Sequence, residues 1–510
     1  MLGRAMNGRT RLAALALSLA GLVAALGACR SSEPPARTAS TASASSGADT
    51  GVAEPLEPVD LYASTSTQGV APSSAPQPSA PCPTGLPGAW TLEKPTTVAG
   101  RISSADYLTP TDIIVTQDGT ATVAYQGAGH LARTADDPPA ADDPMDPSGG
   151  RDETWLEPGD DHLAVDGSRT QTMVIREPVR FNSNTFRQFH DLVVADRPAG
   201  GSWSTAPVTA QDKEITGRVD VAVNASGAAV LVWSQNTRYR AIYRTASDAP
   251  WSGPQRIPAA RAYDFDVDID DAGRIVLAYD RPYENPPGVY AIRRSRDGRW
   301  TPSKQLSGPD TELFGMALNA DGVAVVSHGP TDDGTPLGRV HTSRMTADGT
   351  WQAPVRQPHS LGLHGVSVDE RGRALIGGWD RGSLRGRWSR ADGTWRQSFN
   401  IAADVDDTRR WGLDPHVTAN GRGDALAAWG TKTGGDDLRL WARFAAAGRD
   451  WTKPQRVTPT THQPTRFDAA IGDCGHAAFA WATSGKPPQL HVRRATPSDN
   501  TGRPGQVTGR

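Results

Sequence analysis

The sequence predicts an all-β fold, a β-propeller for which eight four-stranded blades are favoured and seven remain the alternative. A hairpin pattern recurs along the chain, and apolar residues alternate with a period of two inside each copy. The turn glycines of six copies, from Gly227 to Gly475, are spaced about fifty residues apart. Four short strands per unit, repeated every roughly 40–55 residues, are typical of propeller blades.

Each copy combines an apolar strand, a turn with Asn or Asp before Gly, and a second strand that ends in an aromatic residue. The clearest copies span residues 219–233, 265–279, 315–328, 365–379, 416–429 and 467–481, and looser copies span 113–125 and 163–175. A solenoid is the structural alternative, although its units are usually shorter. Helical repeats are excluded because the apolar period is two rather than 3.6.

A third and a fourth strand follow each hairpin. The third is rich in arginine, as in 289–295 and 438–444, and a tight turn leads from it to a Trp-x-x-Pro segment. Three of these turns share a motif, in SRDGRW (295–300), TADGTW (346–351) and RADGTW (390–395). The motif resembles the Asp boxes of sialidase-like β-propellers, with the departure that Asp and Gly are adjacent here.

This resemblance implies that the motif joins the third and fourth strands of a blade, on the face opposite the active site. The segment Gln255–Pro258 is similar to the Arg-Ile-Pro element of the same family, but Gln455–Thr458 occupies the same place in another repeat. We therefore assign both segments to the repeat. A fold does not imply a function, so sialidase activity is not carried over.

The strand register predicts how the ring closes. Trp90 begins a fourth strand that has no preceding three, and the last unit, 467–494, has three strands and no fourth. We expect the N-terminal strand to complete the last blade, which removes two unpaired sheet edges. This closure brings Cys82 near the turn that holds Cys474, so a disulfide between them is expected, with two unpaired cysteines as the alternative. No zinc site is expected from three isolated cysteines.

The N-terminus predicts export. Basic residues precede an apolar run from Leu12 to Leu26, which ends at Leu26-Gly27-Ala28-Cys29 and resembles a bacterial lipobox. We expect a lipoprotein signal peptide at 1–28, lipid on Cys29, and an extracytoplasmic protein anchored to the cell membrane by that lipid. An ordinary secretory signal is the alternative. The run is short for a bilayer span.

Residues 29–81 are rich in Ser, Thr, Ala and Pro, and 496–510 are polar with Gly and Pro. Both are expected to be disordered and to flank a propeller at 82–495. As a flexible tether, the first segment would span about 40 Å. The net charge of -3 offers no basic field for nucleic acid. We expect a monomer with a glycan or protein ligand.

The first residues of the innermost strands are expected at the mouth of a central channel. Aligned by their turns, these positions are Asp112, His162, Asp220, Asp266, Gly315, Gly365, His416 and Asp468. The carboxylates and imidazoles among them could bind a divalent cation or protonate a ligand, although no other cofactor and no dedicated metal site is predicted. The alternative is that each carboxylate accepts backbone N–H groups and fixes one blade to the next.

Aromatic residues end the second strands on the same face. They are Tyr125, Trp233, Tyr279, His328, Trp379, Trp429 and Trp481. Their rings could stack on sugars, or they could pack between blades. Charged pairs follow two of the rings, in Tyr279-Asp280-Arg281 and Trp379-Asp380-Arg381.

Three arginines, Arg176, Arg180 and Arg187, are expected on the longest second-to-third loop, where they could recognise carboxylates or sulfates. No complete catalytic set is recognised in the sequence. The leading hypothesis is therefore a non-catalytic surface propeller that binds glycan or protein. A sialidase-like glycoside hydrolase or polysaccharide lyase is the rival, and an envelope assembly scaffold is a third hypothesis.

Overall fold

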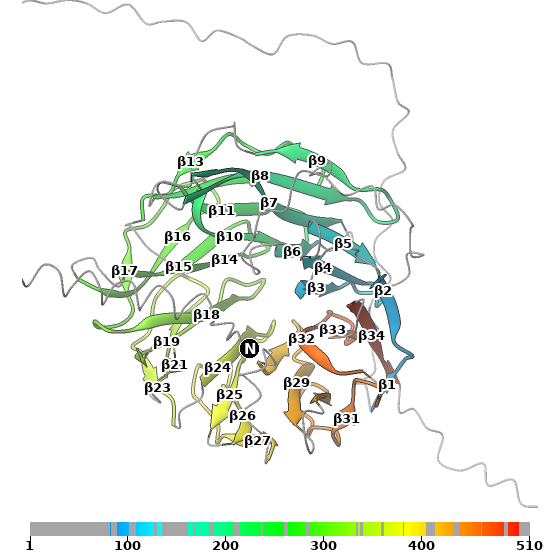
Figure 1. The fold of residues 1–510 in the computed structure, drawn as a ribbon. Helices are drawn as coiled ribbons and strands as arrows, with labels where there is room; N and C mark the ends of the chain where they lie inside the picture. The colour runs from blue at the N-terminus through cyan, green and yellow to red at the C-terminus, as the bar shows by residue number, and fades with distance from the viewer. Residues whose placement is uncertain are drawn as a thin grey trace, which may run out of the picture. The chain divides into compact units, whose positions relative to one another are not determined.

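The computed structural model describes residue 82 and residues 89–498, apart from 101–108, 127–129, 135–161, 167–169, 183–186, 209–214, 236–237, 260–263, 282–285, 333–334, 337–339, 359–361, 381, 404–413, 433–437, 461 and 484–487. These residues form a ring of eight antiparallel sheets, which confirms the all-β propeller with eight blades (Figure 1). No helix in this part of the chain is long and apolar enough to cross a membrane. The predicted signal peptide, Cys29 and the tether lie outside the described residues.

We number the blades along the chain. Blade 1 contains β3 (Thr109–Val115), β4 (Ala121–Gln126) and β5 (His130–Thr134). Blade 2 contains β6 (His162–Val165), β7 (Gln171–Asn182), β8 (Arg187–Arg197) and β9 (Ser204–Pro207). Blade 3 contains β10 (Ile215–Val223), β11 (Ala229–Gln235), β12 (Arg238–Arg244) and β13 (Gln255–Arg256). Blade 4 contains β14 (Phe265–Ile269), β15 (Ile275–Arg281), β16 (Gly288–Arg294) and β17 (Lys304–Gln305).

The later blades repeat this order. Blade 5 contains β18 (Glu312–Leu318), β19 (Ala324–Gly329), β22 (His341–Met345) and β23 (Val355–Arg356), with a small hairpin of β20 (Thr331–Asp332) and β21 (Thr335–Pro336) between its second and third strands. Blade 6 contains β24 (Gly362–Val368), β25 (Ala374–Asp380), β26 (Ser383–Trp388) and β27 (Phe399–Ala402). Blade 7 contains β28 (His416–Ala419), β29 (Ala425–Lys432), β30 (Leu438–Ala445) and β31 (Gln455–Arg456).

Blade 8 closes the ring with strands from both ends of the propeller. Its strands β32 (Pro464–Ile471), β33 (Ala477–Thr483) and β34 (Gln489–Ser498) come from the C-terminal end. The N-terminal strands β1 (Ala89–Leu92) and β2 (Thr96–Gly100) both pair with β34, at its two ends (Figure 1). The predicted closure by the N-terminal strand is therefore confirmed. Strand β34 runs to Ser498, past the predicted end of the propeller at residue 495.

The closure is held by packing as well as by backbone pairing. The ring of Trp90 stacks on Phe444 of blade 7 with centroids 5.0 Å apart, and its Nε1 donates to the carbonyl of Gly475 at 2.8 Å. Cys82 and Cys474 are joined by a disulfide with their Cα atoms 5.0 Å apart. A tryptophan and a cystine thus tie the N-terminal segment to the last two blades.

Side chains alternate between the two faces of each strand, and each face packs against a different neighbouring blade. On β33, Phe479 and Trp481 pack toward blade 7, whereas Ala478, Ala480 and Ala482 pack toward Ile113 and Val123 of blade 1. Large and small residues on opposite faces are what wedge-shaped blades need to interlock. Burying each large side chain stabilises the ring by roughly 1.5–3 kcal/mol.

The turns explain the recurring glycines. In the first hairpin of blade 3, the N–H of Gly227 donates to Asn224 O and the N–H of Asn224 donates to Ala228 O, both at 2.9 Å. Gly227 has φ of 81°, in the left-handed region where a Cβ is disfavoured. The same bond pattern recurs in the three Asp-box-like turns, which join the third and fourth strands as expected.

Candidate functional site in the central channel

The eight channel positions share one register. Each lies on the first strand of its blade and pairs with one residue of the second strand, in the pairs Asp112–Ala124, His162–Val174, Asp220–Val232, Asp266–Ala278, Gly315–Ser327, Gly365–Gly377, His416–Ala428 and Asp468–Ala480. Figure 1 shows the first strands around the centre of the ring and the later strands toward its rim. The sequence alignment of these positions therefore matches their structural alignment.

The expectation that they begin their strands is wrong for most of them. Only β6 and β28 begin at the expected histidine, whereas β10 begins at Ile215 and β32 at Pro464. In five blades the register shifts just before the channel position, at Pro110/Asp112, Ile215/Val219, Leu313/Gly315, Leu363/Gly365 and Pro464/Arg466. These bulges interrupt the period of two, so sequence alternation alone could not extend the strands past them.

The channel aspartates connect neighbouring blades. Oδ2 of Asp112 accepts the N–H of Leu163 at 2.8 Å, and Oδ2 of Asp220 accepts the N–H of Val267 at 3.0 Å. In each case the donor is the residue that follows the channel position of the next blade. Asp266 faces the N–H of Met316 in the same way, and Asp468 faces that of Ile113 across the closure of the ring.

The same device recurs two residues further along the strand. Oδ2 of Asp268 accepts the N–H of Leu318 at 3.0 Å, and Oγ of Ser367 accepts the N–H of Ala419 at 3.0 Å. Blade-to-blade fixation, the alternative that the sequence left open, is therefore what these carboxylates do. The backbone N–H groups involved lie on the innermost strand of the next blade and are not paired within their own sheet. The carboxylates supply the acceptors that these groups need.

One cation contacts this acidic part of the channel. Arg218 lies on β10, and its guanidinium lies 2.8 Å from carboxylate oxygens of Asp264 and of Asp266. Burial disfavours the charge on Arg218, but the carboxylates of Asp266, Asp264 and Asp220 raise its pKa above the ordinary value. Nδ1 of His416 lies 3.2 Å from Oδ1 of Asp468 at the junction of blades 7 and 8.

Burial and crowding raise the pKa values of the channel carboxyls. Burial is the largest cause at each, and it raises the pKa of Asp268 to about 7 and those of Asp220 and Asp266 to about 6. The pKa of Asp112 is raised by burial and by the charge of Asp468, and the pKa of Asp468 is raised by burial. Removal from water makes the ionised carboxylate less favourable than the neutral acid.

The structure does not assemble a cation site from these groups. Among the residues described, no three His, Cys, Asp or Glu side chains lie close enough together to hold a metal ion. The side chain of His162 and the whole of Arg381 lie outside the description. Arg176 and Arg180 lie on β7 and Arg187 on β8, so the expectation of a loop is wrong, because this hairpin continues its pairing as far as Asn182 and Arg187.

The aromatic ends of the second strands pack inside the molecule. Tyr279 is fully buried, with its ring near those of Tyr239 and Tyr290, both 5.9 Å away. Trp379 is buried in the core between blades 6 and 7, and Trp481 in the core beneath Trp90. Stacking of a sugar on these rings is therefore excluded in this structure, because their faces contact protein.

The charged residues after these rings are also engaged. Asp280 is buried and accepts the N–H of Asp264 at 2.9 Å, and the guanidinium of Arg281 lies 4.7 Å from the ring centre of Tyr290. Asp380 is buried and lies 3.3 Å from Nε of Arg385. These contacts keep the loops of the predicted ligand face in place.

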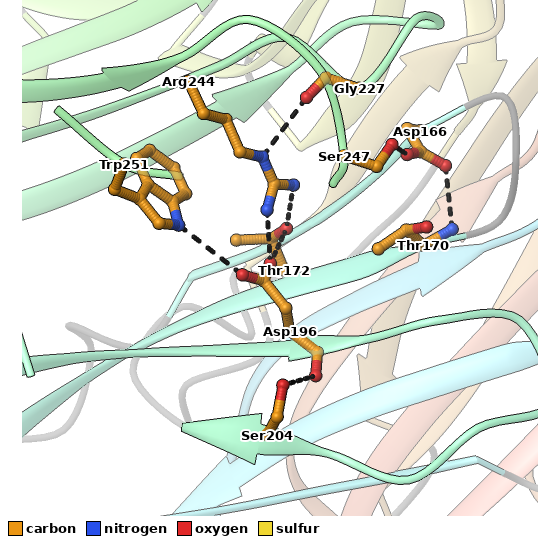
Figure 2. Close-up of polar contacts among 9 residues, drawn as sticks. All are labelled: Asp166, Thr170, Thr172, Asp196, Ser204, Gly227, Arg244, Ser247 and Trp251. Atoms are coloured by element: carbon orange, nitrogen blue, oxygen red, sulfur yellow. Dashed lines mark hydrogen bonds and ion pairs between the residues drawn. The ribbon is translucent and has the colours of Figure 1, made fainter. Parts of the chain in front are cut away.

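The arginine-rich third strands form a second set of inter-blade contacts that sequence reasoning missed. Arg244 on β12 has a side chain that is 1% exposed and reaches blade 2, where it donates to Oδ1 of Asp196 at 2.8 Å and to Oγ1 of Thr172 at 2.7 Å (Figure 2). Within blade 3, Nε of Arg244 donates to the carbonyl oxygen of Gly227 at 3.2 Å. The centre of the Trp251 ring lies 4.9 Å from the guanidinium of Arg244.

Other third strands use arginine in two directions. Arg293 donates forward to Asp348 O and Arg344 forward to Ala391 O, both in Asp-box-like turns of the next blade. Arg443 and Arg493 donate backward to Ile401 O and Val457 O of the preceding blade. Successive side chains of a strand point to opposite faces of the sheet, so arginines at alternate register positions of the third strands reach opposite neighbouring blades. The signal in the sequence was the arginine content of the third strands.

Comparison with known proteins gives no closer assignment than the fold described above. No protein-family model matches the chain, and no curated protein matches it by sequence. Virginiamycin B lyase from Staphylococcus aureus is similar in structure, with a TM-score of 0.42 and 10% identity over 80% of this chain and 99% of the lyase. The Dos1 propeller has a TM-score of 0.42 and 7% identity over 66% of this chain and 92% of its own.

A third similar structure is YCF48 bound to D1 peptide, with a TM-score of 0.37 and 12% identity over 65% of this chain and 91% of its own. Similarity at this level carries no argument about function.

Proposed function

We propose that this chain is an exported, lipid-anchored propeller that binds a glycan or protein ligand without transforming it. The carrying observation is that the described channel aspartates serve as inter-blade acceptors. Asp112, Asp220 and Asp268 each accept an N–H group from the next blade. A carboxylate held in this way stabilises the ring and is poorly placed to attack a substrate.

The ligand face of this proposal is the one formed by the connections between second and third strands. Among the residues that the structure describes, two of these connections carry extra structure, namely the long β7–β8 hairpin of blade 2 and the β20–β21 hairpin of blade 5. Connecting segments on a rigid scaffold are where binding residues concentrate. Hairpins that differ from blade to blade give this face an individual shape that the repeat itself does not have.

The N-terminal pattern supports the location. Cys29 at the end of a signal-like segment, a Ser/Thr/Ala/Pro-rich tether and a cystine in the folded part are mutually consistent in an exported protein. The lipid would supply the membrane contact and the tether would hold the ring away from the surface.

The test is a panel of cell-wall glycans and envelope proteins, assayed for binding and for product release. Replacing Thr331–Pro336 with two glycines removes the β20–β21 hairpin, and this variant should lose ligand binding while keeping its melting temperature. A matched change of Gly253→Ala, at a glycine with no atom within 4 Å of the added Cβ, should leave binding intact. Equal binding by both variants would contradict the proposed face.

The enzyme hypothesis keeps one specific observation in its favour. The pKa of Asp268 is raised to about 7 by burial, and those of Asp220 and Asp266 to about 6, near the range useful to a general acid. A hydrolase or lyase would then release product from one glycan of the panel. If Asp268→Asn abolishes product release and the variant still folds, the binding proposal would be replaced by an enzymatic one. Capture of neighbouring envelope proteins by cross-linking would instead indicate a scaffold.

A further inference from the structure

A groove at the rim of the ring lies apart from the channel. It is formed by the outer strand of blade 5 and by the third-to-fourth turn of blade 6, and has a cavity volume of about 720 Å³. Blade 5 contributes Gln352, Val355 and Arg356, and blade 6 contributes Arg387, Asp392 and Trp395. Pockets of this volume hold small organic ligands.

The groove combines an apolar wall with fixed polar groups. Trp395 is half-buried, and Val355 is the exposed large hydrophobic residue of the described chain, at 43%. The guanidinium of Arg387 lies 5.7 Å from the ring centre of Trp395, and its Nη1 donates to Oε1 of Gln357 at 2.6 Å. These two contacts hold Arg387 in one orientation beside the tryptophan, so little ordering is needed when a ligand binds.

A second cation lies against the residues of the groove. Arg344 of β22 is 8% exposed, and its Nη2 donates to Ala391 O at 2.8 Å, whereas its Nε and Nη1 have no hydrogen-bond partner among the described residues. A Cβ placed on Gly393 would lie 2.9 Å from Cδ of Arg344 and 3.0 Å from Oε1 of Gln352. The blade 6 turn thus lies directly on this arginine.

The charge balance favours an anion. Arg356, Arg387 and Arg344 lie in or against the groove, and Asp392 is its acidic residue. Asp392 is committed to its own turn, where its Oδ1 accepts the N–H of Thr394 at 2.8 Å and the hydroxyl of Thr394 at 2.7 Å. Arg356 and Arg387 line the groove itself, and carboxylate or sulfate groups match the planar geometry of a guanidinium.

We propose that the rim groove between blades 5 and 6 binds an acidic saccharide. The carboxylate or sulfate contacts Arg356 and Arg387, the apolar face of a sugar ring packs on Trp395 and Val355, and Gln352 bonds its hydroxyl groups. Aromatic rings, amides and arginine are the side chains that such a ligand requires together. The site does not depend on the loop face proposed above, because its residues belong to the outer strand and the third-to-fourth turn.

The experiment measures binding of oligogalacturonate and of a sulfated chondroitin oligosaccharide by calorimetry. Methyl-esterified oligogalacturonate serves as the neutral probe. Arg356→Ala should raise the Kd of the charged probe at least tenfold. Arg256→Ala is the matched control, since Arg256 is an exposed arginine at the same position of β13 in blade 3 and should leave the Kd unchanged.

Three results would overturn the proposal. They are binding of neither charged probe, equal binding of the esterified probe, and equal loss in the two arginine variants. The β20–β21 hairpin variant separates this site from the proposed ligand face, because it should bind the charged probe normally. Failure of rim binding with intact loop-face binding would leave the proposed function standing.

Discussion

At the scale of one residue, Asp268 combines inter-blade bonding with an unusual affinity for protons. Its Oδ1 accepts the N–H of Ile269 at 2.8 Å within blade 4, and its Oδ2 accepts the N–H of Leu318 at 3.0 Å in blade 5. Burial raises its pKa from 3.8 to about 7. The folded chain therefore binds a proton at this carboxyl more tightly than the unfolded chain does.

This difference predicts a pH dependence of stability. Between about pH 4 and pH 7 the native state holds the proton and the unfolded state releases it, so the stability that this group contributes falls as pH rises. For one such carboxyl the slope approaches about 1.4 kcal/mol per pH unit. Asp268→Asn, which cannot ionise, should gain stability relative to the native chain from pH 5 to pH 7, as measured by urea unfolding.

Asp348→Asn is the matched control. Asp348 lies in an exposed turn, where the hydroxyl of Thr346 and the N–H of Thr350 lower its pKa below 3.8. Its difference from the native chain should stay flat over the same range, since both states are ionised there. A flat difference for Asp268→Asn as well would contradict the assigned direction of its shift.

Replacing Arg244 should lower the free energy of unfolding substantially, because its buried charge pairs with Asp196. Arg244→Met leaves the carboxylate of Asp196 with Thr172 and Trp251 but without its cation. Removing one partner of a buried ion pair typically costs about 3–5 kcal/mol, and the lower end applies because Asp196 is partly exposed. Arg299→Met is the control, since Arg299 pairs with Asp297 in solvent and its loss should leave the free energy of unfolding close to that of the native chain.

A double-mutant cycle with Asp196→Asn identifies the cause. If the pair itself is responsible, the double variant should lose clearly less stability than the sum of the two single variants. Additive losses in denaturant unfolding would show that Arg244 acts through packing on Trp251 and not through its charge.

At the scale of elements, two glycines at the same register position have opposite surroundings. A Cβ on Gly365 of β24 would lie 1.8 Å from the carbonyl oxygen of Val417 in blade 7. On Gly315 of β18 the nearest atom, Oδ2 of Asp266, would lie 3.7 Å away. Gly365→Ala should therefore push blades 6 and 7 apart and cost about 1–3 kcal/mol.

Gly315→Ala is the comparison for that variant and should stay within about 0.5 kcal/mol of the native chain. Thermal unfolding of the two proteins side by side measures the difference. Equal melting temperatures would mean that β24 and β28 are less closely apposed than the structure shows.

The elements themselves could largely be predicted from sequence because their signals are local. Period-two alternation and a glycine with positive φ, as at Gly227, define a hairpin within fifteen residues of chain. Strand starts could not be predicted, because bulges such as that between Pro110 and Asp112 break the alternation. The pairing of β2 with β34 was not predicted either, because β2 is an additional strand outside the four-strand repeat.

The candidate site could be predicted only in part. Its register positions followed from the repeat, which correctly placed Asp112 and Asp220 on equivalent strands. Their roles depend on backbone N–H groups of the next blade, and a backbone donor has no signature in the sequence. Alternation also could not show that the ring of Tyr279 faces protein and not solvent, because its neighbours Tyr239 and Tyr290 lie on other strands.

At the scale of the whole molecule, the proposed lipid anchor on Cys29 would determine where the propeller operates. Cys29→Ala should prevent lipid attachment, so the protein should leave the membrane fraction or remain uncleaved. Fractionation of cells with lipid labelling is the measurement, and Cys82→Ser is the control that retains the lipid. A Cys29→Ala protein that is still labelled and membrane-bound would contradict the predicted export.

Closure of the ring is the central claim about the whole molecule. Strands β1 and β2 complete blade 8, and Cys82 lies beside the turn that holds Cys474. On the chain-entropy model, a cross-link over 392 residues contributes up to about 6 kcal/mol. Replacing both cysteines with Ser should lower the melting temperature and leave the fold intact, because the strand pairing remains.

Non-reducing peptide mapping of the protein tests this closure most directly. A ring of eight blades closed by the N-terminal strands predicts one disulfide-linked pair of peptides, containing Cys82 and Cys474. Two free thiols, or either cysteine linked to a different partner, would contradict the closure and the strand register on which the channel and rim sites depend.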